Sequence, residues 1–304
     1  MGRAGNGGTR YKAGLHFPFP SRLRAKPEQP RAAPSSPEQK EGPLVPPRFV
    51  LFDYGHTLVN FQRVETALVA AYGEIRERLE SLVEHDLPQA EELAHQITGA
   101  MDVIVHRSYS EGRLQELDIV EMLVDAFAGI GVTLGPELAQ ELAVLDHRAF
   151  SESITVPEST IGVLEALAAR GLTMGLVSNI TLLPDLLRAD LEAFGLARFL
   201  SVAGFSSEVG WRKPDRRIFA HVLERLGAAP EEAVFVGDRL RDDVGGARAA
   251  GMRSVLTRQF RDELEGPERA EALASPGELA HLQPDHVIMA LDELPELLDS
   301  ISSY

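Results

Sequence analysis

Short apolar runs that end in polar or acidic residues recur along the chain, and they constrain its fold more than any other feature. The first run is Arg48 to Phe52, and Asp53 follows it directly. Continuous apolar runs of this length are typical of strands buried on both faces of a parallel sheet. Similar runs occur at 172–177, 199–203, 233–236 and 254–256.

Amphipathic segments separate these runs, and each of them is followed by a glycine. A glycine just beyond the last apolar position is a helix stop signal. The alternation of strand and helix predicts the α/β class, with a doubly wound, Rossmann-like parallel sheet as the core. The helical segments are 159–170 before Gly171, 215–226 before Gly227 and 242–250 before Gly251.

One interval breaks the alternation, because residues 61–150 contain helical patterns and no strand signal. We expect an inserted α-helical cap domain at 61–150, within a core formed by 48–60 and 151–304. Ligands of such sheets bind outside the carboxyl ends of the strands, so an insertion directly after the first strand would cover the pocket. The expected helices lie near 62–84, 89–108, 115–129 and 136–150.

The N-terminal segment has a different composition. Residues 1–48 hold nine of the 19 prolines and carry nine basic and three acidic side chains, a net charge of +6. Without a sustained apolar period this segment cannot bury enough surface to fold, so we expect a disordered Pro/Arg-rich tail at 1–47. An over-extended gene start is the alternative interpretation.

The overall composition excludes several classes of function. The chain contains no cysteine, which removes disulfide scaffolds, thiolate metal centres and thiol catalysis, and which fits a cytoplasmic protein. The net charge of −16 disfavours nucleic acid as a partner. No apolar run reaches the roughly 18 residues of a membrane helix. We therefore expect a small-molecule partner, no nucleic acid and no membrane, and nothing in the sequence defines an oligomeric state.

Polar groups follow several of the predicted strands. In order and spacing they resemble the haloacid dehalogenase-like (HAD) phosphohydrolase superfamily, whose pattern is D-x-D-x-T, a Ser or Thr, K-P, and G-D-x-x-x-x-D. The resemblance covers residues 49–299, and the helical insertion resembles the C1-type cap of that superfamily. The matching residues are Asp53-Tyr54-Gly55-His56-Thr57-Leu58, Ser178-Asn179, Lys213-Pro214-Asp215, and Gly237-Asp238 with Asp242 and Asp243.

The resemblance implies a catalytic carboxylate beside a magnesium ion. Asp53 would be the nucleophile that forms an aspartyl-phosphate, and a hard cation such as Mg²⁺ would screen its repulsion from the phosphoryl group. The metal ligands would be Asp53, the carbonyl of Gly55, Asp238 and Asp243, the last directly or through water.

The same resemblance assigns the phosphoryl group to Ser178, Asn179 and the neighbouring backbone N–H groups. Lys213 would be the catalytic cation that neutralises the remaining charge. Of four lysines in the chain, three lie in the tail, so Lys213 is the one lysine of the expected globular part. This fits a site that needs a compact point charge.

Gly55 departs from the superfamily pattern, since phosphatases of the superfamily carry a second Asp there as general acid and base. Such help is worth about 10²–10⁴ in rate. Three interpretations follow: a substrate with a weakly basic leaving group such as an acyl phosphate, an acid supplied by the cap or by His56, or loss of phosphoryl transfer.

The sequence thus predicts a Mg²⁺-dependent, HAD-type phosphoric monoester hydrolase that acts on a small phosphorylated metabolite. A non-catalytic metal- or ligand-binding module is the alternative, and a carbon–halogen hydrolase is the third. In the cap, Arg113 lies between two expected helices and is either a substrate contact or a solvated loop residue.

Overall fold

The computed structural model describes residues 45–62, 64–260 and 282–302. These residues belong to one unit that spans Pro43–Tyr304. The tail predicted at 1–47 lies outside the described residues except for its last three positions.

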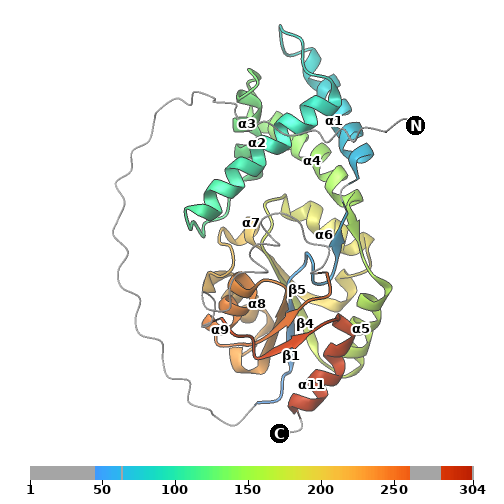
Figure 1. Cartoon of the computed structure of the whole chain (residues 1–304), viewed down its shortest axis with the longest axis vertical. Helices are drawn as coiled ribbons and strands as arrows, with labels where there is room; N and C mark the ends of the chain where they lie inside the picture. Colours follow the sequence, from blue (N-terminus) through green and yellow to red (C-terminus); the bar gives the residue numbers. More distant parts are fainter. Residues whose placement is uncertain (1–44, 63, 261–281, 303–304) are drawn as a thin grey trace, which may run out of the picture. The chain divides into compact units, whose positions relative to one another are not determined.

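Among the described residues, six parallel strands form the central sheet, in the order β5-β4-β1-β6-β7-β8. β1 lies in the interior of the sheet, and Figure 1 shows it beside β4. The α/β prediction is confirmed, and each apolar run of the sequence analysis forms a strand. The strands are β1 Phe49–Phe52, β4 Thr173–Ser178, β5 Leu200–Phe205, β6 Ala233–Gly237, β7 Arg253–Thr257 and β8 His286–Ile288.

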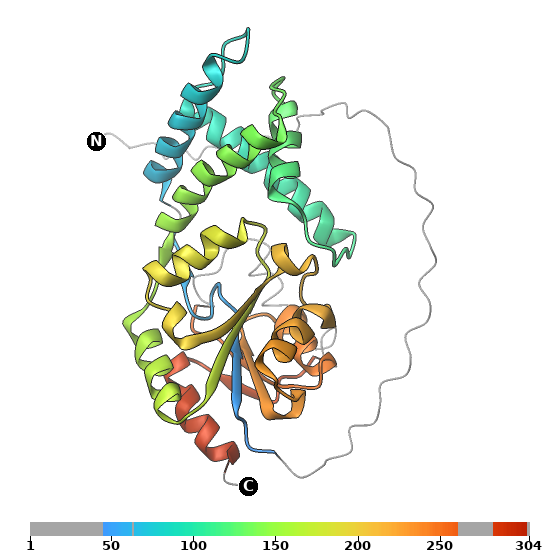
Figure 2. The ribbon, with the colours of Figure 1, turned by 180° about the vertical axis from the view of Figure 1, so that it is seen from behind.

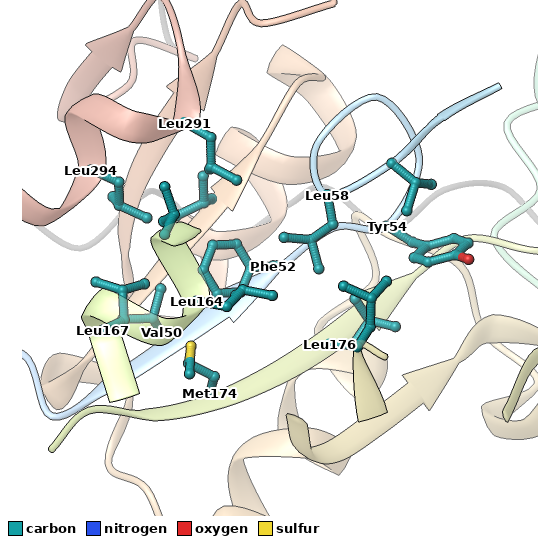
Figure 3. Packing of buried hydrophobic residues seen from close by; sticks show 14 of the residues in the cluster. Val50, Phe52, Tyr54, Leu58, Leu164, Leu167, Met174, Leu176, Leu291 and Leu294 are labelled. Carbon is teal, nitrogen blue, oxygen red and sulfur yellow. The ribbon is translucent and has the colours of Figure 1, made fainter. Parts of the chain in front are cut away.

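The alternating side chains of β1 pack into two apolar layers, because successive residues of a strand point to opposite faces. Val50 and Phe52 pack with Leu164 and Leu167 of α5 (Glu158–Ala169) in one layer. Leu291, in the 3-10 turn before α11 (Leu294–Ser302), and Leu294, at the start of α11, belong to the same layer, as Figure 3 shows.

Phe49 and Leu51 point to the other face of the sheet, where α8 (Arg216–Leu226) covers them. α8 ends at Gly227, whose φ of 63° is left-handed and confirms the predicted helix stop. The interior strand is therefore buried on both faces, as its continuous apolar sequence indicates.

In the described part of the chain, four helices lie between residues 61 and 154, and Figure 2 shows them as a separate group. They enclose their own apolar core, which includes Leu79, Ile97, Phe127 and Leu142. In the described part of the chain no helix has the length and apolar character needed to cross a membrane. The helices are α1 Glu65–Glu80, α2 Ala90–Ser110, α3 Ile119–Ala128 and α4 Pro136–Glu152.

A short two-stranded ribbon lies where the chain enters and leaves the helical insertion. β2 (Asn60–Phe61) pairs antiparallel with β3 (Ile154–Thr155), so that Asn60 lies opposite Thr155. The sequence shows no strand signal at 61–150, and neither of these two-residue strands was predicted. Two residues are too few for an alternating pattern to identify a strand.

Candidate active site

Three neighbouring strands deliver polar groups to one edge of the sheet. Asp53 follows β1, Ser178 ends β4 and Asp238 follows β6. Phe52 pairs with Leu176 on β4 and with Val236 on β6, so these strands end at similar heights. Because the carboxyl ends of parallel strands meet at the same edge, residues far apart in sequence converge there.

Lys213 contacts two acidic side chains at this edge of the sheet. Its ammonium Nζ donates to Asp53 Oδ1 at 2.6 Å and to Asp243 Oδ1 at 2.7 Å, and its side chain is 2% exposed. Burial alone would lower the pKa of Lys213, but Asp243 and Asp53 together outweigh burial and raise it above its ordinary value. Lys213 is therefore a fixed, buried positive charge in contact with the candidate nucleophile.

Asn179 holds the main chain of Lys213. Its Nδ2 donates to the Lys213 carbonyl at 3.1 Å, and its Oδ1 accepts from the Lys213 N–H at 2.6 Å. Both the nitrogen and the oxygen of the Asn179 side-chain amide thus form hydrogen bonds with the main chain of the loop that carries Lys213. Ser178, the other predicted phosphoryl-binding side chain, is 3% exposed at the end of β4.

The carboxylates of Asp53, Asp238 and Asp243 form the candidate metal site, and each offers an oxygen within 4.8 Å of the others. Burial raises the pKa of Asp238 well above its ordinary value, and the charges of Asp243 and Asp53 add to this effect. Asp238 Oδ1 is buried without a hydrogen-bond partner among the described residues. A hard divalent cation such as Mg²⁺ fits this site, because it would satisfy that oxygen and neutralise the crowded charge.

Asp243 is placed by a local distortion of the helix predicted at 242–250. Leu240–Gly245 forms a π-helical turn, and α9 begins only at Gly246 (Gly246–Ala249). Asp243 Oδ2 accepts from the Arg239 N–H at 2.9 Å. A Cβ on Gly237 would overlap the Asp243 carboxylate, so the glycine before Asp238 is what allows Asp243 to lie against the end of β6.

Gly55, where the superfamily pattern has a second Asp, faces an aromatic ring. A Cβ built on Gly55 would lie 2.5 Å from Phe61 Cε2. Phe61 belongs to β2 and contacts Phe150 of α4 at a ring-centroid distance of 5.3 Å. The space for a side chain at position 55 is therefore filled by an apolar ring.

His56, considered as a substitute acid, follows Gly55 in a left-handed backbone conformation with φ of 54°. Its Nδ1 lies 3.2 Å from Asn60 Oδ1, and its ring meets Phe61 edge to face at 5.4 Å. Left-handed backbone is uncommon for residues other than glycine, although histidine is among those that tolerate it.

In the cap, Arg113 pairs with Glu111 at 2.6 Å, and 66% of its side chain is exposed. Two residues of the core–cap contact have buried side chains and were not predicted from the sequence: Glu116 of the cap and Arg212 of the core. The position of Arg212 beside the one lysine of the fold was a signal, whereas nothing in the sequence singles out Glu116.

The chain is similar in sequence to known hydrolases. The family model described as haloacid dehalogenase-like hydrolase matches residues 47–251. A phosphoserine phosphatase from Thermus thermophilus is 44% identical over 120 residues, which are 40% of this chain and 47% of that protein. A glyceraldehyde 3-phosphate phosphatase from Methanopyrus kandleri is 30% identical over 69% of this chain and 83% of that protein.

Solved structures share the fold. A HAD phosphatase from Thermococcus onnurineus matches with a TM-score of 0.50 and 25% identity, over 83% of this chain and 97% of that chain. A 2-haloacid dehalogenase from Pseudomonas syringae matches with a TM-score of 0.55 and 23% identity, over 84% and 99%.

The family match covers more than half of the sequence, and the chain belongs to the haloacid dehalogenase-like hydrolase family. The matched segments span 47% and 59% of the length of two curated relatives, the phosphoserine phosphatase and a ribulose-1,5-bisphosphate 5-phosphatase from Halopiger xanaduensis.

Proposed function

We propose that this chain is a Mg²⁺-dependent phosphohydrolase that acts on a small phosphorylated metabolite through an aspartyl-phosphate at Asp53. The observation that carries the proposal is the contact of the Asp53 carboxylate with the buried Lys213 ammonium at 2.6 Å, beside Asp238 and Asp243. The phosphatases named among its relatives support phosphorus rather than carbon as the centre of attack.

In this mechanism an Asp53 carboxylate oxygen attacks phosphorus, and the bond between phosphorus and the leaving oxygen breaks. Water then attacks the phosphorus of the aspartyl-phosphate, which releases inorganic phosphate and regenerates Asp53. Lys213 balances negative charge in both steps, since its raised pKa keeps it protonated at neutral pH. Ser178 and the N–H groups that follow β4 would orient the phosphoryl oxygens.

Asp53, Asp238, Asp243 and the Gly55 carbonyl would hold the metal. When bound, Mg²⁺ supplies positive charge that lets a carboxylate approach a phosphoryl group.

The leaving group determines which substrates fit this site. Position 55 carries no acid, and the ring of Phe61 occupies the space beside it. An alkoxide leaving group needs a proton, whereas an acyl phosphate leaves as a weakly basic carboxylate. We therefore propose that turnover is fastest with acyl phosphates and other activated phosphates.

The test is a Mg²⁺-supplemented phosphate-release assay over a series of leaving groups, from acetyl phosphate through nitrophenyl phosphate to alkyl phosphates. Activity should fall steeply as leaving-group basicity rises, and Asp53→Asn should abolish it. Asp185→Asn is the matched control, because the Asp185 side chain is fully exposed on the surface. Activity that persists in Asp53→Asn or without Mg²⁺ would refute the mechanism.

A metal- and phosphate-binding module without turnover is the second candidate, and the apolar filling beside Gly55 favours it. In that case Mg²⁺ and a phosphate analogue such as beryllofluoride should bind to the wild-type chain, and no phosphate release should occur with any substrate of the series.

A further inference from the structure

Arg212, the residue before Lys213, extends its side chain into the cap. The residue is 1% exposed, and its Nη2 donates to the carbonyl oxygens of Arg113 at 3.2 Å and Gln115 at 3.1 Å. The same nitrogen donates to the Ser108 hydroxyl, at the end of α2. One guanidinium therefore binds three oxygen atoms of the cap segment 108–115.

Main-chain hydrogen bonds join the same two segments. The Arg212 N–H donates to the Leu114 carbonyl at 2.7 Å, and the Glu116 N–H donates to the Gly210 carbonyl at 3.0 Å. Gln115 and Trp211 lie opposite each other as an antiparallel pair. The loop that leads into Lys213 is thus paired with the cap loop up to the residue next to the lysine.

Glu116 extends the contact to two more core loops. Its side chain is 2% exposed, its Oε1 accepts from Thr181 Oγ1 at 2.9 Å, and its Oε2 accepts from the Ser206 hydroxyl. Oε1 also lies 3.7 Å from Arg212 Nε. Thr181 stands two residues after Asn179, the side chain that holds the main chain of Lys213.

We propose that Arg212 is a positioning residue that makes the placement of Lys213 depend on the docked cap loop 113–116. Lys213 needs its ammonium within hydrogen-bond distance of both Asp53 and Asp243, and the segment that brings it there is fixed by Asn179 on one side and by the cap loop on the other. The link to catalysis rests on the proposed function, whereas the structural link between the loops does not.

The first test compares Arg212→Met with Arg216→Met, a matched control in which an exposed arginine at the start of α8 is changed. Misplacing a catalytic group by about 1 Å can cost on the order of 100-fold in rate, so Arg212→Met should lower kcat by roughly 10- to 100-fold, with a smaller change in KM. Arg216→Met should retain the wild-type kcat.

An engineered disulfide distinguishes a positioning role of Arg212 from a general effect of Arg212→Met on stability. The chain has no cysteine of its own, and antiparallel partners have Cα atoms about 4.5–5.5 Å apart, within the range that a disulfide spans. Gln115→Cys with Trp211→Cys therefore allows the cap loop to be fastened to the lysine loop in the Arg212→Met variant. Oxidation should restore most of the lost kcat, and dithiothreitol should remove it again.

Amide hydrogen exchange gives a readout that needs no turnover. In Arg212→Met, exchange should accelerate both at 113–116 and at 210–213, and the disulfide should slow both. If oxidation raises the melting temperature but leaves kcat low, or if exchange rises in the cap loop alone, the proposal is wrong. A wild-type chain without phosphatase activity would overturn the proposed function, and the exchange experiment would still decide the structural link.

Discussion

The ring of Phe61 occupies the space into which any side chain at position 55 would extend, since a Cβ on Gly55 would lie 2.5 Å from Phe61 Cε2. Phe61 is held in turn by Phe150 at 5.3 Å and by His56 at 5.4 Å between ring centroids. A side chain at position 55 therefore requires the ring of Phe61, on the ribbon between sheet and cap, to move.

The first prediction concerns restoring the acid. Gly55→Asp alone should be destabilising, because the new side chain collides with Phe61, and overpacking of this kind typically costs about 1–3 kcal/mol. Gly55→Asp combined with Phe61→Ala should accommodate the carboxyl group and should raise kcat/KM for alkyl phosphates by roughly 10²–10⁴. Phosphate release and urea unfolding measure the two effects.

Phe61→Ala alone is the control for this pair, and it should not gain activity on alkyl phosphates. If Gly55→Asp by itself is as stable and as active as the double variant, the ring is not the obstacle that the geometry indicates.

The second prediction is a pH dependence of stability without metal. The pKa of Asp238 is raised in the folded state above its ordinary 3.8, so the folded chain keeps this proton over a range where the unfolded chain has lost it. The free energy of unfolding should therefore decrease as pH rises from 3.8 through the raised pKa. Asp238→Asn should weaken this decrease and should raise the melting temperature of the metal-free protein at neutral pH.

The third prediction concerns the metal. Mg²⁺ should stabilise the wild-type chain by about 2.7 kcal/mol at 100 times its dissociation constant, because it binds the folded state and relieves the repulsion among Asp53, Asp238 and Asp243. Thermal unfolding in a magnesium titration measures this gain. Asp238→Asn should abolish it, and an equal gain in that variant would place the ion elsewhere.

The fourth prediction concerns a buried contact between α4 and α6 (Pro184–Ala193). His147 Nε2 lies 3.0 Å from Asp190 Oδ2, and Ser151 Oγ donates to Asp190 Oδ1 at 2.7 Å. His147→Leu should cost about 1–3 kcal/mol, because it removes the polar imidazole that lies against the buried Asp190 carboxylate. Urea unfolding measures the loss, and adding Asp190→Asn should recover part of it.

The same histidine should affect acid stability. Burial lowers the pKa of His147 below its ordinary 6.5, partly opposed by Asp190, so the folded state resists protonation. The free energy of unfolding should fall as pH drops through 6.5, and this slope should be shallower in His147→Leu. An unchanged slope would assign the effect to other groups.

The sequence predicts the sheet well because the evidence for it is local. Each buried strand is a continuous apolar run, and each polar group of the site follows directly after a run or lies in a motif of fixed spacing. Asp53, Ser178 and Asp238 could therefore be placed at the carboxyl ends of strands of one parallel sheet. The strand β8 was not predicted; it lies at the edge of the sheet, and one of its three residues is buried.

Contacts between distant segments could not be predicted in the same way. The ring of Phe61 lies beside Gly55 in a two-residue strand that pairs with β3. Two residues are too few to show the alternating pattern of a strand in the sequence. Asn179 was expected to bind substrate, and in the structure its amide holds the main chain of Lys213, because the loop after β4 meets the loop before α8. In the sequence Glu116 looks like any other acidic residue. Its contacts arise because the cap loop pairs with Trp211 and its neighbours.

The pairing of Asn60 with Thr155 has a consequence for how this protein can be altered. The insertion leaves and rejoins the core at adjacent positions, about 5 Å apart as in any antiparallel pair. A helical segment of different length or sequence can therefore be grafted between these two points without changing the register of any sheet strand. Recombination at the ribbon would exchange one helical insertion for another, provided that the new insertion supplies its own partner for Arg212.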